Sequence, residues 1–295
     1  MDTSKTIKRL LYVLVAINIY VASFITALGI SYTLMSYNSN QSYIPEPYKA
    51  GDIEGDAVPN NGGQPNSPNN RVNAPVPTDE YFYFDNNGNK YIKNYEIIFN
   101  SARPYQFVRV EGQGKESSLN FITIFVDPFC AACHYLYGEM PAFEDKLGGD
   151  VVYMIRHFPV VSENSIYAAR QIECAGKIGG AEAYYKAHLL YKDVFTSTLQ
   201  IEDIGARLAD RLNLDPDRLK QCAASEEIKN NVAKDMEIGY KLKFGGTPTI
   251  FLNGMLVDGA LPHDALFAMF ETTMNNPKPR LNVPIDELPM FSFKQ

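Results

Sequence analysis

Two cysteine residues two positions apart give this 295-residue sequence its clearest chemical signal. Cys130 and Cys133 follow the apolar run Leu119–Val126 and precede an amphipathic segment, Tyr135–Leu147. This pattern predicts a buried strand that leads into a helix. Cys130 would then lie at the helix N-terminus, where unpaired N–H groups and the helix dipole favour a thiolate. A second cysteine one turn further along can attack a mixed disulfide formed by the first, so the pair suits thiol–disulfide exchange.

Two other kinds of chemistry use the same spacing. Cys130, Cys133 and the adjacent His134 also match the attachment pattern of a c-type haem, but a cytochrome would place it on an early helix rather than after a buried strand. Structural zinc needs four converging ligands, usually in two close pairs, and Cys174 and Cys222 are isolated. We therefore predict no metal and no cofactor other than the redox-active Cys130–Cys133 disulfide.

The segments around the pair predict an α/β domain. Val151–Phe158 is a second apolar run, and small and apolar residues recur at helical spacing over residues 164–240. A further strand is expected after Pro248, and a last helix over His263–Met274. Helices placed between strands in this way are typical of the α/β class.

The N-terminus predicts a membrane anchor. Three basic residues precede an uncharged segment at residues 10–35, which is long enough to span a bilayer at about 20 apolar residues per crossing. The positive-inside rule places residues 1–9 in the cytoplasm and the rest of the chain outside it. A cleaved signal peptide is the alternative, although its apolar region is normally about 7–15 residues long and ends at a small-x-small site.

The remaining segments connect and flank the domain. Residues 36–78 are rich in Asn, Pro, Gly and Ser, which predicts a flexible linker. Residues 79–103 are aromatic-rich around a turn signal, which predicts a small β-rich N-terminal extension. Residues 275–295 contain four prolines and predict an extended C-terminal tail. A net charge of −7 without a basic stripe argues against nucleic acid as a partner.

Three motifs together resemble the DsbA-like branch of the thioredoxin family. They are an apolar strand into Cys130-Ala131-Ala132-Cys133, a helical insertion with Ala168-Ala169-Arg170 near its start, and Gly246-Thr247-Pro248-Thr249-Ile250 before a strand, a turn, a strand and a helix. The resemblance implies a thioredoxin-like fold over residues 104–274 with a helical insertion at about 164–240. An N-terminal transmembrane helix would precede this domain.

The resemblance also implies roles for individual residues. Cys130 would be the exposed nucleophile, and Cys133 the buried thiol that resolves mixed disulfides. Pro248 would follow a cis peptide bond and face the cysteines. The backbone of Thr247 would bind the substrate as an added strand.

The other two cysteines, Cys174 and Cys222, lie in the expected helical insertion. Thiols that lie close together in an oxidising compartment tend to pair, and some DsbA-like proteins contain such a disulfide. We therefore predict a structural Cys174–Cys222 disulfide. The alternative is that both are buried, unlinked thiols.

Two features depart from the DsbA-like oxidases. Strong oxidants of this branch commonly carry Pro-His between the cysteines, whereas this chain has Ala131-Ala132. We therefore expect weaker stabilisation of the thiolate and a less oxidising disulfide. Asp127 before the pair and His134 after it are similar to the disulfide isomerase branch, and His134 is a candidate modulator of the thiol pKa values.

These observations favour a single-pass thiol–disulfide oxidoreductase of the bacterial inner membrane, with its thioredoxin domain in the periplasm. We expect an oxidase that acts on cysteine-containing exported proteins. A membrane redox partner would reoxidise or reduce the pair. The enzymatic alternative is a reductase or isomerase. The non-enzymatic alternative is a non-catalytic thioredoxin-fold component of an envelope assembly.

Overall fold

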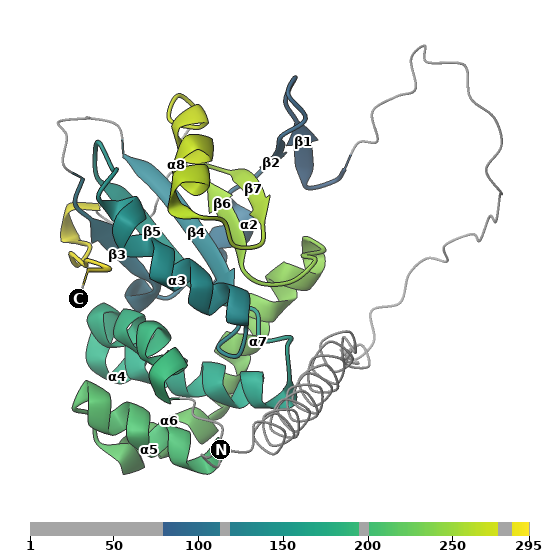
Figure 1. Cartoon of the computed structure of the whole chain (residues 1–295). Coiled ribbons are helices and arrows are strands. Elements are labelled where there is room, and N and C mark those ends of the chain that lie inside the picture. Colours follow the sequence, from purple (N-terminus) through teal and green to yellow (C-terminus); the bar gives the residue numbers. More distant parts are fainter. Residues whose placement is uncertain (1–78, 113–118, 195–200, 277–284, 295) are drawn as a thin grey trace, which may run out of the picture. The chain divides into compact units, whose positions relative to one another are not determined.

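A mixed seven-stranded sheet lies at the centre of the part of the chain that the computed structural model describes, residues 79–112, 119–194, 201–276 and 285–294 (Figure 1). The predicted cytoplasmic end, anchor and linker, residues 1–78, lie outside these ranges. Within the described ranges, no helix is long and apolar enough to cross a membrane.

The strand order in the sheet is β1-β2-β7-β6-β4-β5-β3. The strands are β1 (Phe82–Phe84), β2 (Lys90–Ile92), β3 (Phe107–Val110), β4 (Asn120–Val126), β5 (Val151–His157), β6 (Thr249–Leu252) and β7 (Met255–Asp258). Strands β4 and β5 are parallel, and all other neighbours are antiparallel. The parallel pair is connected by α3 (Ala131–Glu144). This arrangement confirms the predicted α/β class.

Four helices form the insertion between β5 and β6. They are α4 (Glu163–Val194), α5 (Ile201–Leu212), α6 (Pro216–Ala224) and α7 (Glu226–Lys241), whereas α2 (Glu96–Phe99) and α8 (His263–Thr272) lie outside the insertion. Helix α4 is interrupted at Gly180, whose φ of 78° is a left-handed conformation that glycine adopts at low cost. Asp215 caps α6 by accepting a hydrogen bond from the backbone N–H of Arg218 (2.8 Å).

Alternation along β4 divides the core between the two faces of the sheet. Ile122, Ile124 and Val126 belong to the hydrophobic cluster that includes buried residues of α3 and α8. Phe125 points the other way and belongs to the cluster that includes α7. Helix α3 is therefore held against the central strand by a continuous apolar surface, which determines where the cysteines lie.

The N-terminal extension forms a hairpin that is part of the main sheet. Strands β1 and β2 pair with each other, and Tyr91 of β2 pairs with Met255 of β7. A helical turn, α2, follows the hairpin. Residues 79–103 thus contain the expected short strands, but these strands extend the sheet at its β7 edge.

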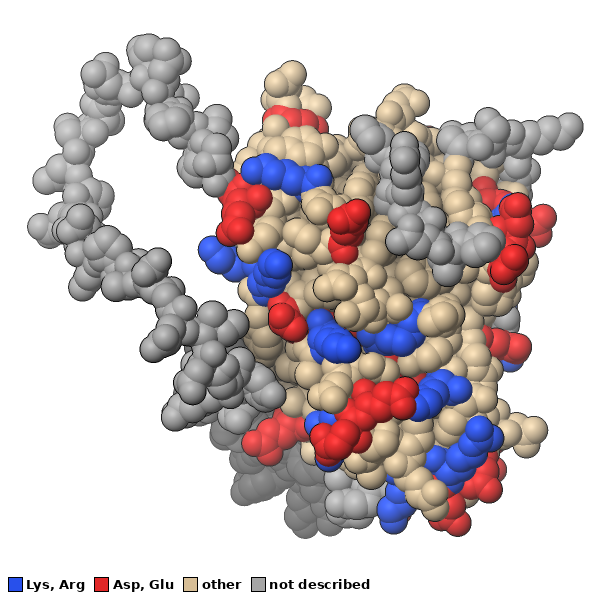
Figure 2. All heavy atoms as spheres, turned by 180° about the vertical axis from the view of Figure 1, so that it is seen from behind, with Lys and Arg blue, Asp and Glu red and all other residues tan. Residues whose placement is uncertain are grey.

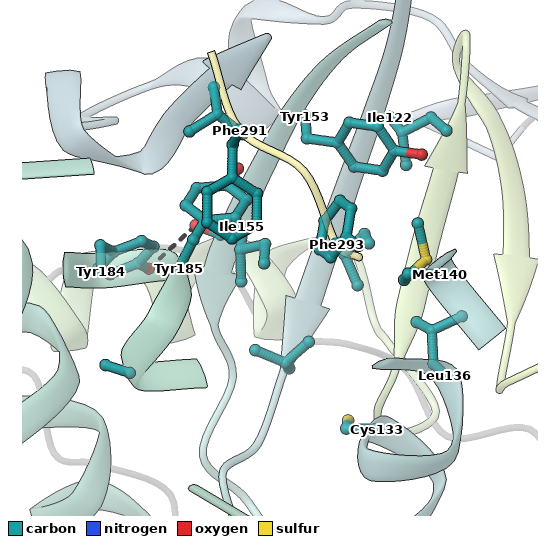
Figure 3. Packing of buried hydrophobic residues seen from close by; sticks show 14 of the residues in the cluster. Ile122, Cys133, Leu136, Met140, Tyr153, Ile155, Tyr184, Tyr185, Phe291 and Phe293 are labelled. Atoms are coloured by element: carbon teal, nitrogen blue, oxygen red, sulfur yellow. Dashed lines mark hydrogen bonds between the residues drawn. The ribbon is translucent and has the colours of Figure 1, made fainter. Parts of the chain in front are cut away.

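The end of the C-terminal tail is packed into the core. Phe291 and Phe293 are 5% and 3% exposed, and their rings lie 5.0 Å from Tyr185 and 5.1 Å from Tyr153 (Figure 3). The buried carboxylate of Glu144 accepts a hydrogen bond from the backbone N–H of Phe293 (2.7 Å). The tail differs here from a free extended segment because burial of two aromatic rings outweighs the cost of ordering a few residues.

A disulfide joins α4 to α6. It links Cys174 and Cys222, which are 48 positions apart, and this is the pairing that the resemblance implied. Both residues belong to the helical insertion, so the bond closes a loop within it.

Replacing Cys174 and Cys222 together by alanine should lower the free energy of unfolding by about 4 kcal/mol. The cross-link removes entropy from the unfolded chain, and a loop of 48 residues gives an effect of about this size. Urea denaturation of the full chain measures the difference. The matched control is the Cys130→Ser/Cys133→Ser double variant, which keeps the structural bond. A Cys174→Ala/Cys222→Ala variant as stable as the wild type would contradict the prediction.

Candidate active site

Helix α3 begins at the CxxC pair. Cys130 is the N-cap residue of α3, and its backbone carbonyl accepts a hydrogen bond from the N–H of His134 (3.1 Å). Cys130 is partly exposed, whereas Cys133 is fully buried. In Figure 3, Cys133 lies on the same helix as Leu136 and Met140, which face the core. One thiol is therefore accessible and the other is shielded from solvent.

The loop before β6 brings a second segment to the thiol. The Thr247–Pro248 peptide bond is cis, and the backbone carbonyl of Thr247 accepts a hydrogen bond from the Cys130 thiol (3.1 Å). Two further bonds brace the loop: the Thr249 hydroxyl donates to the Gly246 carbonyl (2.8 Å), and the N–H of Gly259 donates to the Pro248 carbonyl (2.9 Å). Positions 130 and 247, far apart in the sequence, thus meet at one site.

The environment of Cys130 favours its thiolate. The largest influence on the pKa of Cys130 is a hydrogen bond from the Cys133 thiol. The Thr247 side chain and the backbone N–H groups of Ala132 and Cys133 act in the same direction. Together they lower this pKa to about 6, although burial opposes the change. The Thr247 hydroxyl is buried and has no hydrogen-bond partner among the described residues. It is therefore available to donate to a thiolate, a contribution that sequence reasoning missed.

The environment of Cys133 has the opposite effect. Burial raises the pKa of Cys133 well above its usual range, and the adjacent Cys130 adds to this increase. At neutral pH the exposed thiol is therefore mostly ionised and the buried one is protonated. This asymmetry fits a nucleophile and a resolving thiol.

The reactivity of Cys130 should follow a titration with a midpoint near pH 6, rather than near the value of about 8.5 for an ordinary cysteine. Only the thiolate reacts with iodoacetamide, so the alkylation rate should rise between about pH 5 and 7 and then level off. Mass spectrometry of the reduced full chain, quenched at successive times, measures this rate at Cys130. A midpoint above pH 8 would contradict the stabilised thiolate.

The turn before the pair is organised by Asp127. This buried carboxylate accepts hydrogen bonds from the backbone N–H groups of Phe129, Val160 and Val161, each at 2.7 Å. Burial raises the pKa of Asp127 despite these bonds. Asp127 thus joins the start of α3 to the segment after β5 and acts as a structural anchor for the site.

His134 lies next to the pair but is held by another contact. Its Nε2 atom donates to the Pro128 carbonyl (2.7 Å). The main influences on the pKa of Cys130 are Cys133, burial and Thr247. The geometry therefore gives His134 a role in fixing the turn, and its proposed effect on the thiols stays a prediction.

Charged and potential metal-ligating side chains are dispersed over the described part of the chain. Among the described residues, no group of three His, Cys, Asp or Glu side chains could hold a metal ion. Figure 2 shows positive and negative side chains intermixed over the face opposite that of Figure 1, without a continuous basic surface on its described part.

Comparison with known proteins relates this site to thioredoxins. The family model described as thioredoxin matches residues 110–271. The thiol–disulfide exchange protein α-DsbA2 of Wolbachia pipientis is a structural neighbour with a TM-score of 0.50 and 19% identity, over 60% of this chain and 91% of that one. A thioredoxin-like oxidoreductase of Silicibacter pomeroyi has a TM-score of 0.49 and 24% identity, over 61% of this chain and 96% of that one. BdbD of Bacillus subtilis has a TM-score of 0.49 and 20% identity, over 57% of this chain and all of that one.

Two curated relatives match part of this chain. They are the Na⁺/H⁺ antiporters NhaA 3 of Salinispora tropica, 30% identical over 141 residues, and NhaA 1 of Salinispora arenicola, 29% identical over 138 residues. Each match covers 46% of this chain and 21% of the relative. The chain therefore spans about a fifth of the length of the curated relatives that it matches.

Proposed function

Because the chain belongs to the thioredoxin family, we propose that it is a thiol–disulfide oxidoreductase that forms disulfides in exported proteins. The observation that carries this proposal is the contrast between a partly exposed Cys130 with a pKa of about 6 and a fully buried Cys133. A thiol pair in which one sulfur is accessible and ionised is suited to exchange with a protein substrate.

The proposed reaction starts from the Cys130–Cys133 disulfide. A substrate thiolate attacks the accessible sulfur of Cys130, and the Cys133 sulfur leaves and takes up a proton. A second substrate thiolate then attacks the substrate sulfur of the mixed disulfide, so that the substrate disulfide forms and Cys130 leaves as a thiolate. The low pKa of Cys130 makes it a good leaving group in this second step. The backbone of Thr247, beside Cys130, would hold the substrate segment.

The direction of the reaction follows from stabilisation of the reduced form. Ala131 and Ala132 provide no imidazole, yet the Cys133 thiol, the Thr247 side chain and the helix N–H groups lower the pKa of Cys130 to about 6. This value lies between about 7 in thioredoxin and about 3.5 in DsbA. We therefore expect a moderately oxidising pair, with a reduction potential between about −270 and −120 mV.

The location is also part of the proposal. The uncharged segment at residues 10–35 behind three basic residues supports an inner-membrane anchor with a periplasmic domain. The Cys174–Cys222 disulfide suits an oxidising compartment. A membrane redox partner would then reoxidise the pair. Labelling Cys130 in intact cells with a maleimide that passes the outer but not the inner membrane tests this location.

Two assays with the purified full chain test the function. An oxidase regenerates active ribonuclease from its reduced form, and a reductase precipitates insulin by breaking its interchain disulfides. We expect the first activity and a Cys130/Cys133 reduction potential above about −200 mV, measured against glutathione. Insulin reduction with a potential near −270 mV would assign a reductase. No activity in either assay would overturn the proposed function.

A further inference from the structure

The buried Cys133 thiol must exchange a proton during every cycle. It gains a proton when a substrate opens the disulfide, and it loses one when the pair is reoxidised through a mixed disulfide on Cys130. Cys133 is 0% exposed. The strand beneath it, Asn120–Val126, carries no acidic side chain, and Asp127 already accepts three backbone hydrogen bonds. The proton therefore needs another route.

Tyr137 lies one helical turn after Cys133 on α3, and its hydroxyl is within hydrogen-bond distance of His188 on α4. Tyr137 follows Cys133 by four positions on α3, a spacing that places two side chains on one helix face with Cβ atoms about 5–6 Å apart. Cys133 is a buried member of the main hydrophobic cluster, and Tyr137 packs against that cluster. The Tyr137 hydroxyl lies 3.3 Å from Nδ1 of His188, which is 2% exposed.

The surroundings of His188 keep its imidazole neutral. Its ring centroid lies 5.3 Å from that of His157 on β5 and 4.7 Å from that of Tyr184 on α4. Burial, and then His157, lower the pKa of His188 well below its usual range, whereas Asp235 on α7 opposes them. His157 is itself 3.2 Å from the carboxylate of Glu173. Asp235, whose negative charge favours the protonated form of His188, is itself held by ion pairs with Arg103 and the buried Arg156.

We propose that Tyr137 and His188 form a proton relay for Cys133. As the Cys133 sulfur attacks the mixed disulfide, its proton passes to the Tyr137 oxygen, and the hydroxyl proton of Tyr137 passes to Nδ1 of His188. The Cys130–Cys133 bond forms, and the bond between Cys130 and the departing sulfur breaks. Tyr137 ends unchanged, and His188 ends as an imidazolium that later releases the proton to solvent.

The reverse sequence protonates Cys133 when a substrate opens the disulfide. Neutral His188 must carry its hydrogen on Nε2, so that Nδ1 accepts. The relay rests on the proposed function, because it serves the Cys133 half of that reaction.

Oxidised glutathione oxidises the reduced full chain in two steps that can be measured separately. Cys130 first forms a mixed disulfide with glutathione, and Cys133 then displaces the glutathione. Acid quenching and mass spectrometry measure first the glutathionylated protein and then the intramolecular disulfide. Tyr137→Phe and His188→Gln should slow the second step about a hundredfold at pH 6 and leave the first within about twofold. The second step in both variants should also accelerate about tenfold per pH unit, because hydroxide replaces the relay as base, whereas the wild type should depend less on pH.

Tyr153→Phe is the matched control, because it makes the same substitution at a buried tyrosine whose hydroxyl has no partner among the described residues. It should behave as the wild type. An unchanged second step in Tyr137→Phe, or equal slowing in Tyr153→Phe, would overturn the relay. Circular dichroism shows whether each variant is folded. If His188→Gln does not fold, the test of the relay rests on Tyr137→Phe. If the reduced wild-type chain formed no mixed disulfide with glutathione, the proposed function itself would be overturned.

Discussion

Replacing Cys130 with serine should reduce the rate of thiol–disulfide exchange by more than about 10³-fold, while replacing Cys133 should stop the reaction half-way. The Cys130 thiol is the accessible one and the one whose pKa is lowered to about 6. A serine hydroxyl cannot form a disulfide, so the variant has no group at position 130 that can bond to the substrate sulfur. The buried Cys133 is shielded from the substrate and cannot replace it.

The Cys133→Ser variant should accumulate mixed disulfides. Cys130 still attacks substrate disulfides, but no second thiol displaces the substrate. Non-reducing electrophoresis of cells that express the variant should show cross-linked species that dithiothreitol removes. These species should disappear in the Cys130→Ser/Cys133→Ser double variant, which serves as the control.

The ribonuclease and insulin assays give the rates of all variants. The Cys174→Ala/Cys222→Ala variant keeps the redox pair and should retain activity under conditions in which it is folded. If Cys130→Ser retained the wild-type rate, the redox site would have to lie elsewhere. Retention of the cellular phenotype by an inactive Cys130→Ser chain would favour a scaffold role.

Local sequence patterns were sufficient to predict the elements that position the thiols. An apolar strand followed by an amphipathic helix depends on neighbouring residues, and β4 and α3 form as expected, with Cys130 as N-cap. The meeting of Cys130 with Thr247 could not be derived in this way. It depends on the pairing of β6 with β4, and only the family resemblance indicated it.

Buried polar contacts between distant elements escaped the sequence analysis entirely. His157, His188 and Asp235 occupy ordinary strand and helix positions, and nothing in their spacing indicates that they share a buried region. The packing of Phe291 and Phe293 was missed for the same reason, because the prolines before them predicted only extended backbone. Local periodicity determines which face a residue occupies, but not which distant residue it meets.

A buried ionic cluster around Asp235 provides the second large expected effect. Asp235, fully buried on α7, accepts hydrogen bonds from Arg103 (2.6 Å) and from Nε of Arg156 (3.1 Å). It also accepts from the side chain of Gln106 and the backbone N–H of His157, both at 3.1 Å. One carboxylate thus joins α7 to β5 and to the segment before β3, and its charge also acts on His188 of the proposed relay.

Asp235→Asn should lower the free energy of unfolding by about 3–5 kcal/mol, because it leaves buried arginine charge without its partner. Urea denaturation measures the loss. Glu237→Gln, an exposed change two positions further along the same helix, should stay within about 0.5 kcal/mol of the wild type. Equal losses in the two variants would contradict a specific ionic role for Asp235.

The pH dependence of this difference distinguishes charge from shape. Burial alone would raise the pKa of Asp235, but Arg156 and Arg103 outweigh it and hold that pKa well below the usual range. A carboxylate with a depressed folded-state pKa contributes its full stabilisation above its unfolded pKa of about 3.9 and loses it as the pH falls further. The gap between wild type and Asp235→Asn should therefore be constant from about pH 5 to 8 and narrow below about pH 4. A gap of the same size at pH 2 and pH 7 would mean that packing, rather than the ion pairs, holds these elements together.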